Sequence, residues 1–154
     1  MLGNWSVTDF WVNRRHVFIF MSDKSLLSFL LLEGKMKFEL ADLQVLFING
    51  LTQLLEFLVI PQVSIDAAIA DLEVMAVTKT KDRSILGNLT ALVDAYQAGI
   101  YRRGGLKSFD LTELILNVNS RPQRRLGWAT PSEMTLGLVT KTDISLLKLD
   151  RVVI

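Results

Sequence analysis

The stretch that organises the chain is Val77-Thr78-Lys79-Thr80-Lys81-Asp82-Arg83-Ser84-Ile85-Leu86-Gly87-Asn88-Leu89. Its first part is β-branched, which is typical of a strand. From residue 84 onward the apolar side chains follow helical spacing, and either Asp82 or Ser84 can cap the start of that helix. The stretch therefore predicts a strand over residues 73–80 that leads into a helix ending near Ala98.

Upstream of this stretch, three short segments predict an antiparallel meander: Trp5–Val12, His16–Ser22 and Ser25–Leu32. The connections between them are too short for crossovers, so neighbouring segments must run in opposite directions. The third segment is apolar on both of its alternating faces, and we expect it to be covered on both sides. With residues 73–80 added, the predicted antiparallel sheet has about four strands.

Four more segments have helical patterns. The longest, Glu39–Val59, is amphipathic, and Asp42, Asn49, Gln53 and Glu56 lie on its polar stripe. The others are expected at Ser64–Leu72, Asp110–Asn119 and Thr130–Leu138, with capping residues at their first positions. We therefore predict one α+β domain over residues 1–139, with helices packed mainly on one face of the sheet, and a strand or tail over residues 140–154.

The composition limits the classes of function. A chain of 154 residues is long enough for one domain with a sizeable core. Half of the residues are apolar, yet no apolar run approaches the roughly 18 residues that span a bilayer. The absence of cysteine excludes a disulfide, a thiolate nucleophile and a cysteine metal site. We expect a cytoplasmic protein with no membrane partner.

No catalytic group stands out. The single histidine, His16, follows Arg14 and Arg15, whose charges disfavour an imidazolium and repel a metal ion. The sequence shows no nucleophile or orienting carboxylate around His16, so a hairpin residue is the favoured interpretation. The carboxylates are more typical of a solvated face than of a paired site. We therefore predict no catalytic residue, no metal site and no cofactor, and we favour a domain that is not an enzyme.

Lys79-Thr80-Lys81-Asp82-Arg83-Ser84-Ile85-Leu86-Gly87 resembles the core motif of an uncharacterised bacterial family, one of the domains of unknown function. Leu2-Gly3-Asn4-Trp5 and the Asn13-Arg14-Arg15 hairpin are also similar to motifs of that family. The resemblance implies a fold but no activity. Its members carry a strand and a helix before the Leu-Gly-x-Trp motif, so we expect this chain to be N-terminally shortened. That would leave one sheet edge open, either for a homodimer or for residues 140–154.

Residues 119–133 give a second, local resemblance. Asn119-Ser120-Arg121-Pro122-Gln123-Arg124-Arg125-Leu126-Gly127-Trp128-Ala129-Thr130-Pro131-Ser132-Glu133 is similar to the end of transposase and integrase catalytic domains. The upstream sequence lacks the spaced carboxylates that hold two metal ions in those enzymes. The same segment is also a natural turn followed by a capped helix, and this is the favoured interpretation.

Charge is unevenly distributed along the chain. Residues 1–78 carry five Lys/Arg and nine Asp/Glu, whereas residues 79–125 carry nine Lys/Arg and four Asp/Glu. Basic side chains interleaved with Tyr101 and Trp128 suit phosphate contacts and base stacking, but they can equally be solvated loops that balance an acidic face. The tentative anion- or nucleic-acid-binding residues are Lys79, Lys81, Arg83, Ser84, Arg102, Arg103, Arg121, Arg124, Arg125 and Trp128, with Lys107 nearby.

These observations favour a small interaction domain of unknown role that binds a protein or nucleic-acid partner. The alternative is a degenerate or accessory module related to mobile-element proteins. For residues 82–87 two interpretations compete. Either the helix start binds an anion, or Asp82 or Ser84 caps the helix, Arg83 pairs with a nearby carboxylate, and Gly87 allows close packing of the helix on the sheet.

Overall fold

The computed structural model describes residues 1–34, 39–72, 82–107 and 110–141. Its sheet has three antiparallel strands, β1 (Trp5–Val12), β2 (Arg15–Ser22) and β3 (Ser28–Leu32), in the order β1-β2-β3. The β1–β2 register pairs Trp5 with Ser22, and the β2–β3 register pairs Met21 with Ser28. The predicted meander and the α+β class are therefore confirmed.

The third strand begins three residues later than expected. Residues 23–27 form a compact turn, in which the Ser25 backbone N–H donates to the Ser22 hydroxyl at 3.1 Å and Leu26 takes a positive φ of 59°. The turn is closed by backbone hydrogen bonds of 2.9 Å between Ser22 and Leu26 and between Ser22 and Leu27. Because these groups are already paired within the turn, the ladder starts only at Ser28.

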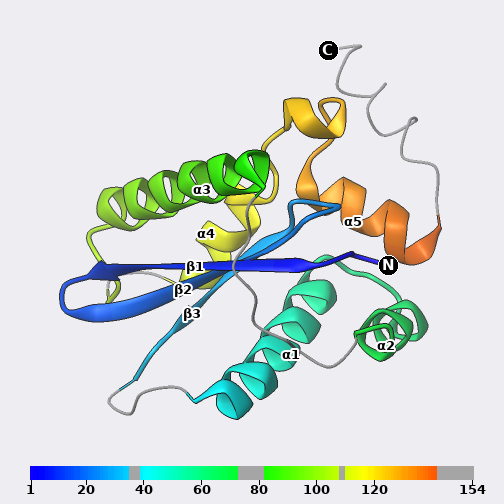
Figure 1. Ribbon diagram of the computed structural model, residues 1–154, viewed down its shortest axis with the longest axis horizontal. Coiled ribbons are helices and arrows are strands. Elements are labelled where there is room, and N and C mark those ends of the chain that lie inside the picture. The colour runs from blue at the N-terminus through cyan, green and yellow to red at the C-terminus, as the bar shows by residue number, and fades with distance from the viewer. Residues whose placement is uncertain (35–38, 73–81, 108–109, 142–154) are drawn as a thin grey trace.

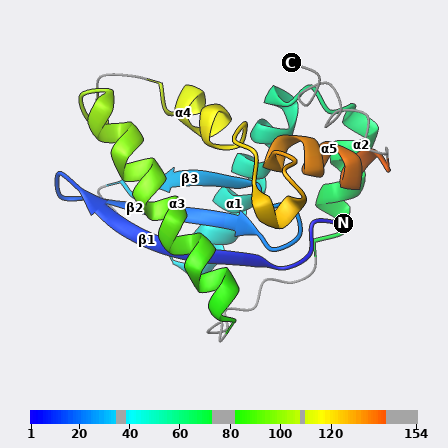
Figure 2. The same ribbon diagram turned by 90° about the horizontal axis from the view of Figure 1, so that it is seen from above.

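The helices cover both faces of the sheet (Figure 1). On one side lies α1 (Leu40–Phe57), which contacts β3 and packs against α2 (Gln62–Ala70). On the other side lie α3 (Arg83–Arg102), which crosses β1 and β2 in Figure 2, and α4 (Leu111–Val118), which contacts β3. A short 3-10 turn, η1 (Arg124–Leu126), leads into α5 (Pro131–Thr140), which packs against α2.

The expectation that the helices pack mainly on one face is therefore wrong. The reason lies in β2, whose side chains are apolar at consecutive positions. Val17 and Ile19 belong to the core beneath α3 and α4, whereas Phe20 belongs to the core beneath α1. A strand that is apolar on both faces needs a layer on each side. The same holds for β3, where Phe29 faces α1 and Leu30 faces α3 and α4, so its predicted double coverage is confirmed.

Several helix boundaries differ from the predictions, and three of them have a clear physical reason. Helix α2 begins at Gln62 rather than Ser64, because the Pro61 carbonyl already accepts from the N–H groups of Ser64 and Ile65 at 2.9 and 3.1 Å. Helix α3 continues past Ala98 to Arg102 because Gly99 lies inside it, against the buried Leu114 of α4. Helix α1 ends at Phe57, two residues before Val59, which takes a positive φ of 59°.

Some predictions fall outside the described residues. The fourth expected strand, residues 73–80, is one of them, and so is most of the expected C-terminal strand or tail, residues 142–154. The sheet that the structure describes thus has three strands rather than about four. In the described part of the chain, no helix combines the length and the apolar character that crossing a bilayer requires.

Candidate functional site

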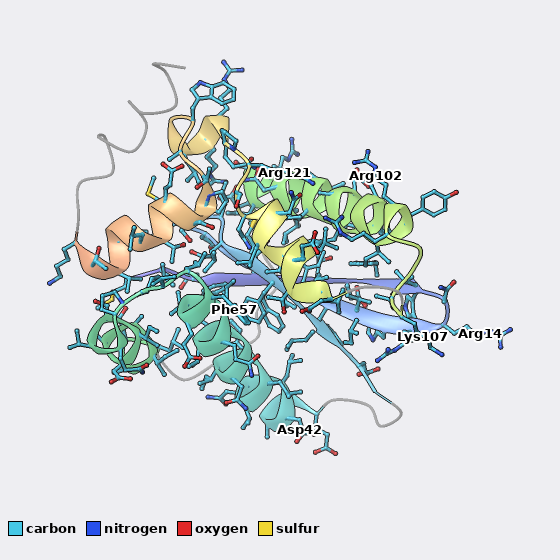
Figure 3. All side chains as sticks on the ribbon, turned by 180° about the vertical axis from the view of Figure 1, so that it is seen from behind. Arg14, Asp42, Phe57, Arg102, Lys107 and Arg121 are labelled. Atoms are coloured by element: carbon cyan, nitrogen blue, oxygen red, sulfur yellow. The ribbon has the colours of Figure 1, made fainter. Side chains whose placement is uncertain are left out.

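The basic residues singled out in the sequence divide into two groups along α3. Arg83 and Ser84 form its first turn and Arg102 its last, and 20 residues at about 1.5 Å each separate them by roughly 30 Å. Figure 3 shows Arg102, Lys107 and Arg14 toward one end of α3 and Arg121 toward the other. Arg103 follows directly on Arg102, at the C-cap. Lys79 and Lys81 lie outside the described residues.

One contact joins two of the basic segments at the start of α3. The Arg125 guanidinium donates from Nη1 to the Ser84 hydroxyl at 3.0 Å, across 41 positions of sequence. The turn that presents Arg125 is held by a 2.9 Å bond from the Trp128 N–H to the Gln123 carbonyl, and Gly127 and Trp128 both have positive φ. Trp128 is 60% exposed. We call this region the arginine surface: Arg83, Ser84, Arg121, Arg124, Arg125 and Trp128.

Among the described residues, no ion pair joins a carboxylate to an arginine of the arginine surface. Arg121 donates to the neutral Asn117 side-chain carbonyl at 3.0 Å, and Arg125 donates to a neutral hydroxyl. The ion pairs formed within the described ranges involve other residues, namely the N-terminal amine with Asp71 and His16 with two carboxylates. Guanidinium groups that donate to neutral acceptors keep their net charge available to an anion.

The start of α3 itself is already capped. The Asp82 carboxylate accepts from the N–H groups of Ser84 and Ile85 at 2.9 and 3.3 Å. Asp82 is thus the N-cap, and Ser84 is a partner of Arg125. An anion at this end of the molecule would therefore contact the guanidinium groups rather than the free N–H groups of the helix. The expected role of Gly87 is wrong, since a Cβ at this position would meet no atom within 4 Å.

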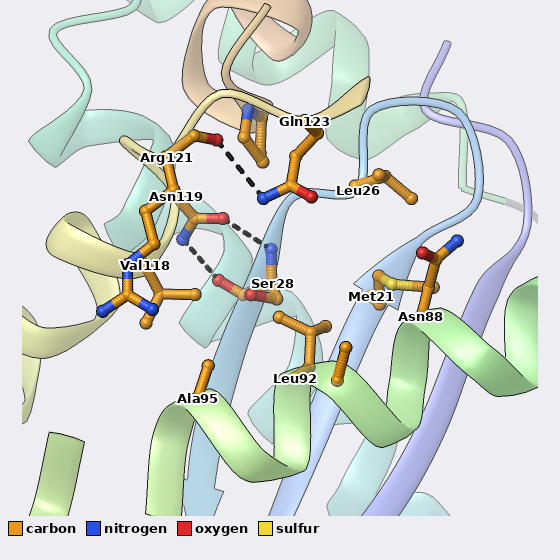
Figure 4. Close-up of a pocket in the computed structure, with 12 residues that line it drawn as sticks. Met21, Leu26, Ser28, Asn88, Leu92, Ala95, Val118, Asn119, Arg121 and Gln123 are labelled. Carbon is orange, nitrogen blue, oxygen red and sulfur yellow. Dashed lines mark hydrogen bonds between the residues drawn. The ribbon is translucent and has the colours of Figure 1, made fainter. Parts of the chain in front are cut away.

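A narrow cavity of about 90 Å³ runs along α3 beside the arginine surface. Figure 4 shows Asn88, Leu92 and Ala95 of α3 on one side and Val118, Asn119, Arg121 and Gln123 on the other. Met21, Leu26 and Ser28 form its floor. We call this cavity the α3 groove, defined by Asn88, Ala91, Leu92, Ala95, Arg121 and Gln123. Spacings of three, four and seven residues place the four α3 positions on one helix face.

Asn119 fixes the wall of the groove to the sheet. Its amide accepts from the Ser28 N–H at 2.9 Å and donates to the Ser28 carbonyl at 2.7 Å, so it fills the pairing positions of the outer strand. It also donates to the Ile115 carbonyl at 2.8 Å. The Ser28 hydroxyl in turn bonds the Tyr96 hydroxyl at 2.8 Å. All three side chains are buried, and burial raises the pKa of Tyr96 above its ordinary value despite the opposing effects of Ser28 and Arg121.

A second polar cluster lies on the sheet face opposite α3 and was missed in the sequence. His16 Nε2 lies 2.5 Å from an Asp9 oxygen, and His16 Nδ1 lies 3.4 Å from a Glu33 oxygen. The Trp11 ring stacks on the imidazole, with centroids 4.4 Å apart and planes at 5°. The statement that no carboxylate orients His16 is thus wrong. The register of the β1–β2 hairpin could have revealed this cluster. It places Trp11 directly opposite His16, and Asp9, two residues before Trp11, lies on the same face of the sheet.

The chemistry of this cluster is limited. Both ring nitrogens of His16 face carboxylates, so the arrangement ties β1 and β2 to the residue after β3. Among the described residues, the histidine and carboxylates form no group of three or more that is arranged to hold a metal ion. We regard the cluster as a structural tie and the arginine surface with the α3 groove as the candidate site.

Comparison with known proteins places the chain in a family but gives it no activity. No curated protein and no solved structure matches the chain. The resemblance of residues 119–133 to transposases gains no support from these comparisons. In the structure this segment forms the turn and capped start of α5, with the Thr130 hydroxyl accepting from the Glu133 N–H. The sequence model of a family described as a domain of unknown function (DUF6933) matches residues 1–134, and the chain belongs to that family.

Proposed function

We propose that the protein is a non-enzymatic binding domain whose partner is a single-stranded nucleic acid, held on the arginine surface. The observation that carries the proposal is the 3.0 Å bond from Arg125 to Ser84, because it gathers arginines from distant segments at one end of α3. One planar guanidinium group can donate two parallel hydrogen bonds to the oxygens of one phosphate. Arginines that lie together at one end of the molecule can therefore contact successive phosphates.

Trp128 supplies the second element of the proposal. Single-strand binding proteins combine a basic path for the backbone with aromatic rings on which bases stack. Trp128 is 60% exposed and follows directly on the turn that carries Arg124 and Arg125. A protein partner with an acidic surface would use the same arginines but would not depend on stacking. The contribution of Trp128 therefore separates the two kinds of partner.

The test is fluorescence anisotropy with a labelled single-stranded DNA of about 12 nucleotides, within the range of single-strand site sizes. Affinity should fall as salt rises, with a log–log slope of about −0.7 for each phosphate neutralised. Replacing Arg124 and Arg125 together by alanine should weaken binding and make the slope shallower by about 1.4. The matched control replaces Arg14 and Arg102 by alanine at the other end of α3, and should leave the slope unchanged.

Stacking is tested separately. Trp128→Ala should cost about 1–3 kcal/mol of binding free energy without changing the salt slope, whereas Trp128→Phe should keep most of the affinity. Equal losses from the two double-arginine variants would show that only net charge matters. Absence of DNA and RNA binding at about 50 mM salt, where electrostatic binding is strong, would refute the proposal.

A further inference from the structure

The connection between α1 and α2 holds three apolar side chains out in solvent. Phe57 ends α1, Val59 follows two residues later, and Val63 lies in the first turn of α2; they are 55%, 85% and 76% exposed. Successive Cα atoms are about 3.8 Å apart, so Val59 lies within about 8 Å of Phe57 and about 15 Å of Val63. Neighbouring exposed apolar side chains indicate an interaction surface. We call this region the α1–α2 corner: Glu56, Phe57, Val59, Val63 and Asp66.

The backbone at Val59 makes the exposure of its side chain unusual. Helix α1 ends in a Schellman motif, in which the Ile60 N–H donates to the Leu55 carbonyl at 3.2 Å and the Val59 N–H to the Glu56 carbonyl at 3.0 Å. The position that takes a positive φ in this motif is usually glycine. Here it is Val59, with a φ of 59°, the only β-branched residue with a positive φ in the described part of the chain. Because a branched side chain is strained in this conformation, an apolar group stands in solvent where glycine would be more stable.

The charge around the α1–α2 corner is negative. Residues 39–72 contain five carboxylates and no Lys, Arg or His. Glu56 lies three residues before Val59, and Asp66 lies three residues after Val63 on the same helix, so each carboxylate neighbours an exposed valine. Both carboxylates belong to exposed residues, and the ion pairs formed in the described ranges include neither of them. Such a surface repels nucleic acid and anionic lipid, and it attracts a partner that is apolar and positively charged.

The backbone of the corner favours a helical partner over an extended one. The N–H groups of Val59 and Ile60 are paired within the Schellman motif, and the Pro61 carbonyl accepts from the N–H groups of Ser64 and Ile65. An extended peptide binds through main-chain hydrogen bonds to a free sheet edge. An amphipathic helix satisfies its own backbone and docks through its side chains, which is what the α1–α2 corner can accept.

We propose that the α1–α2 corner binds a cationic amphipathic helix of a protein partner. The apolar stripe of that helix covers Phe57, Val59 and Val63, and the lysines or arginines beside the stripe approach Glu56 and Asp66. A helix of about 14 residues is roughly 21 Å long, enough to cover the corner. The proposal is independent of nucleic-acid binding, since the corner lies on the α1 side of the sheet and α3, which begins the arginine surface, lies on the other (Figure 1).

The probe is a fluorescently labelled peptide of about 14 leucine and lysine residues, with the leucines on one helix face. Fluorescence anisotropy should detect its binding to the full chain at protein concentrations of about 100 μM or below. One control peptide has glutamate in place of lysine. A second has the same composition with leucine and lysine alternating, which suits a strand. Both controls should bind at least about tenfold more weakly.

Val59→Gly separates binding from stability. It should weaken binding of the helical peptide about tenfold, because a covered valine side chain is lost. It should also raise the Tm by about 2–4 °C, because glycine relieves the strain at this position, whereas damage to the fold would lower the Tm. Val45→Ser is the matched control. It removes an apolar side chain that is 59% exposed on α1, about 18 Å before Phe57 along the helix, and should leave binding unchanged.

A pair of double variants tests the charge. Glu56→Gln combined with Asp66→Asn should weaken binding of the helical peptide about tenfold. Asp94→Asn combined with Glu113→Gln removes the same charge from exposed positions of α3 and α4, on the other side of the sheet, and should leave binding nearly unchanged.

The proposal is supported if binding falls in Val59→Gly and in the corner carboxylate variant but not in their matched controls. It is overturned by equal losses in the two carboxylate variants, by equal binding of the helical and alternating peptides, by a lower Tm in Val59→Gly, or by no binding at about 100 μM protein. Self-association of the protein that Val59→Gly abolishes would also overturn it, since the corner would then belong to a second copy of the chain.

Discussion

Gly99 marks the closest approach of α3 and α4, and its replacement by alanine gives a sharp test of the fold. A Cβ at residue 99 would lie 2.4 Å from Leu114 Cδ1 and 3.3 Å from Leu114 Cδ2. Carbon atoms in contact normally lie about 3.5–4.0 Å apart, so the new methyl group is more than 1 Å too close. Leu114 is fully buried and cannot turn toward solvent.

The magnitude follows from two opposing effects. Overpacking a buried site costs about 1–3 kcal/mol, and so short a contact belongs near the upper end. Alanine restores up to about 1 kcal/mol of helix propensity relative to glycine. We therefore expect Gly99→Ala to lower the free energy of unfolding by about 2 kcal/mol. Urea denaturation followed by circular dichroism measures it.

Gly87 in the same helix is the matched control. A Cβ there meets nothing within 4 Å, so Gly87→Ala should raise the free energy of unfolding by about 0.5–1 kcal/mol. In a Leu114→Ala background the methyl group at residue 99 has room, and Gly99→Ala should no longer destabilise. If Gly99→Ala and Gly87→Ala stabilise the wild-type protein alike, the close approach of α3 and α4 is wrong.

Two further predictions concern the start and the middle of α3. Asp82→Ala should lower the free energy of unfolding by about 1 kcal/mol, because it removes the acceptor for two N–H groups, whereas Ser84→Ala should leave the cap intact. Burial raises the pKa of Tyr96, so above about pH 10 the unfolded tyrosine ionises while the folded one stays neutral. The stability present below that pH should fall as pH rises through it, more steeply in wild type than in Tyr96→Phe, as measured by urea denaturation at each pH.

Local patterns predicted most of the elements. Two of the three strands have the expected bounds to within one residue, and the polar stripe of α1 is exposed as the spacing of Asp42, Asn49 and Gln53 indicates. The expectation that the helices lie mainly on one face was wrong, although the third segment was already predicted to be covered on both sides. The consecutive apolar residues of β2 already indicate that both faces of the sheet are covered.

The candidate site was only partly predictable. Composition singled out the arginines, but nothing in their spacing shows that Arg125 returns to Ser84 or that Arg102 lies about 30 Å away, at the far end of a 20-residue helix. The contact between Arg125 and Ser84 depends on how the loop before α5 packs against α3. The two residues are 41 positions apart, and a contact over that distance leaves no periodic pattern in a single sequence. The α3 groove was invisible for the same reason, because Ala91 and Ala95 are ordinary helix residues.

Asn119 also narrows where the predicted homodimer could form. An outer strand associates with a second chain through its unpaired N–H and C=O groups. At Ser28 both groups are bound by the Asn119 amide, so a second copy would have to displace a buried side chain to pair at the start of β3. Of the two outer strands in the described sheet, β1 is also longer, with eight residues against five. If two copies pair edge to edge through these strands, β1 is therefore the favoured edge.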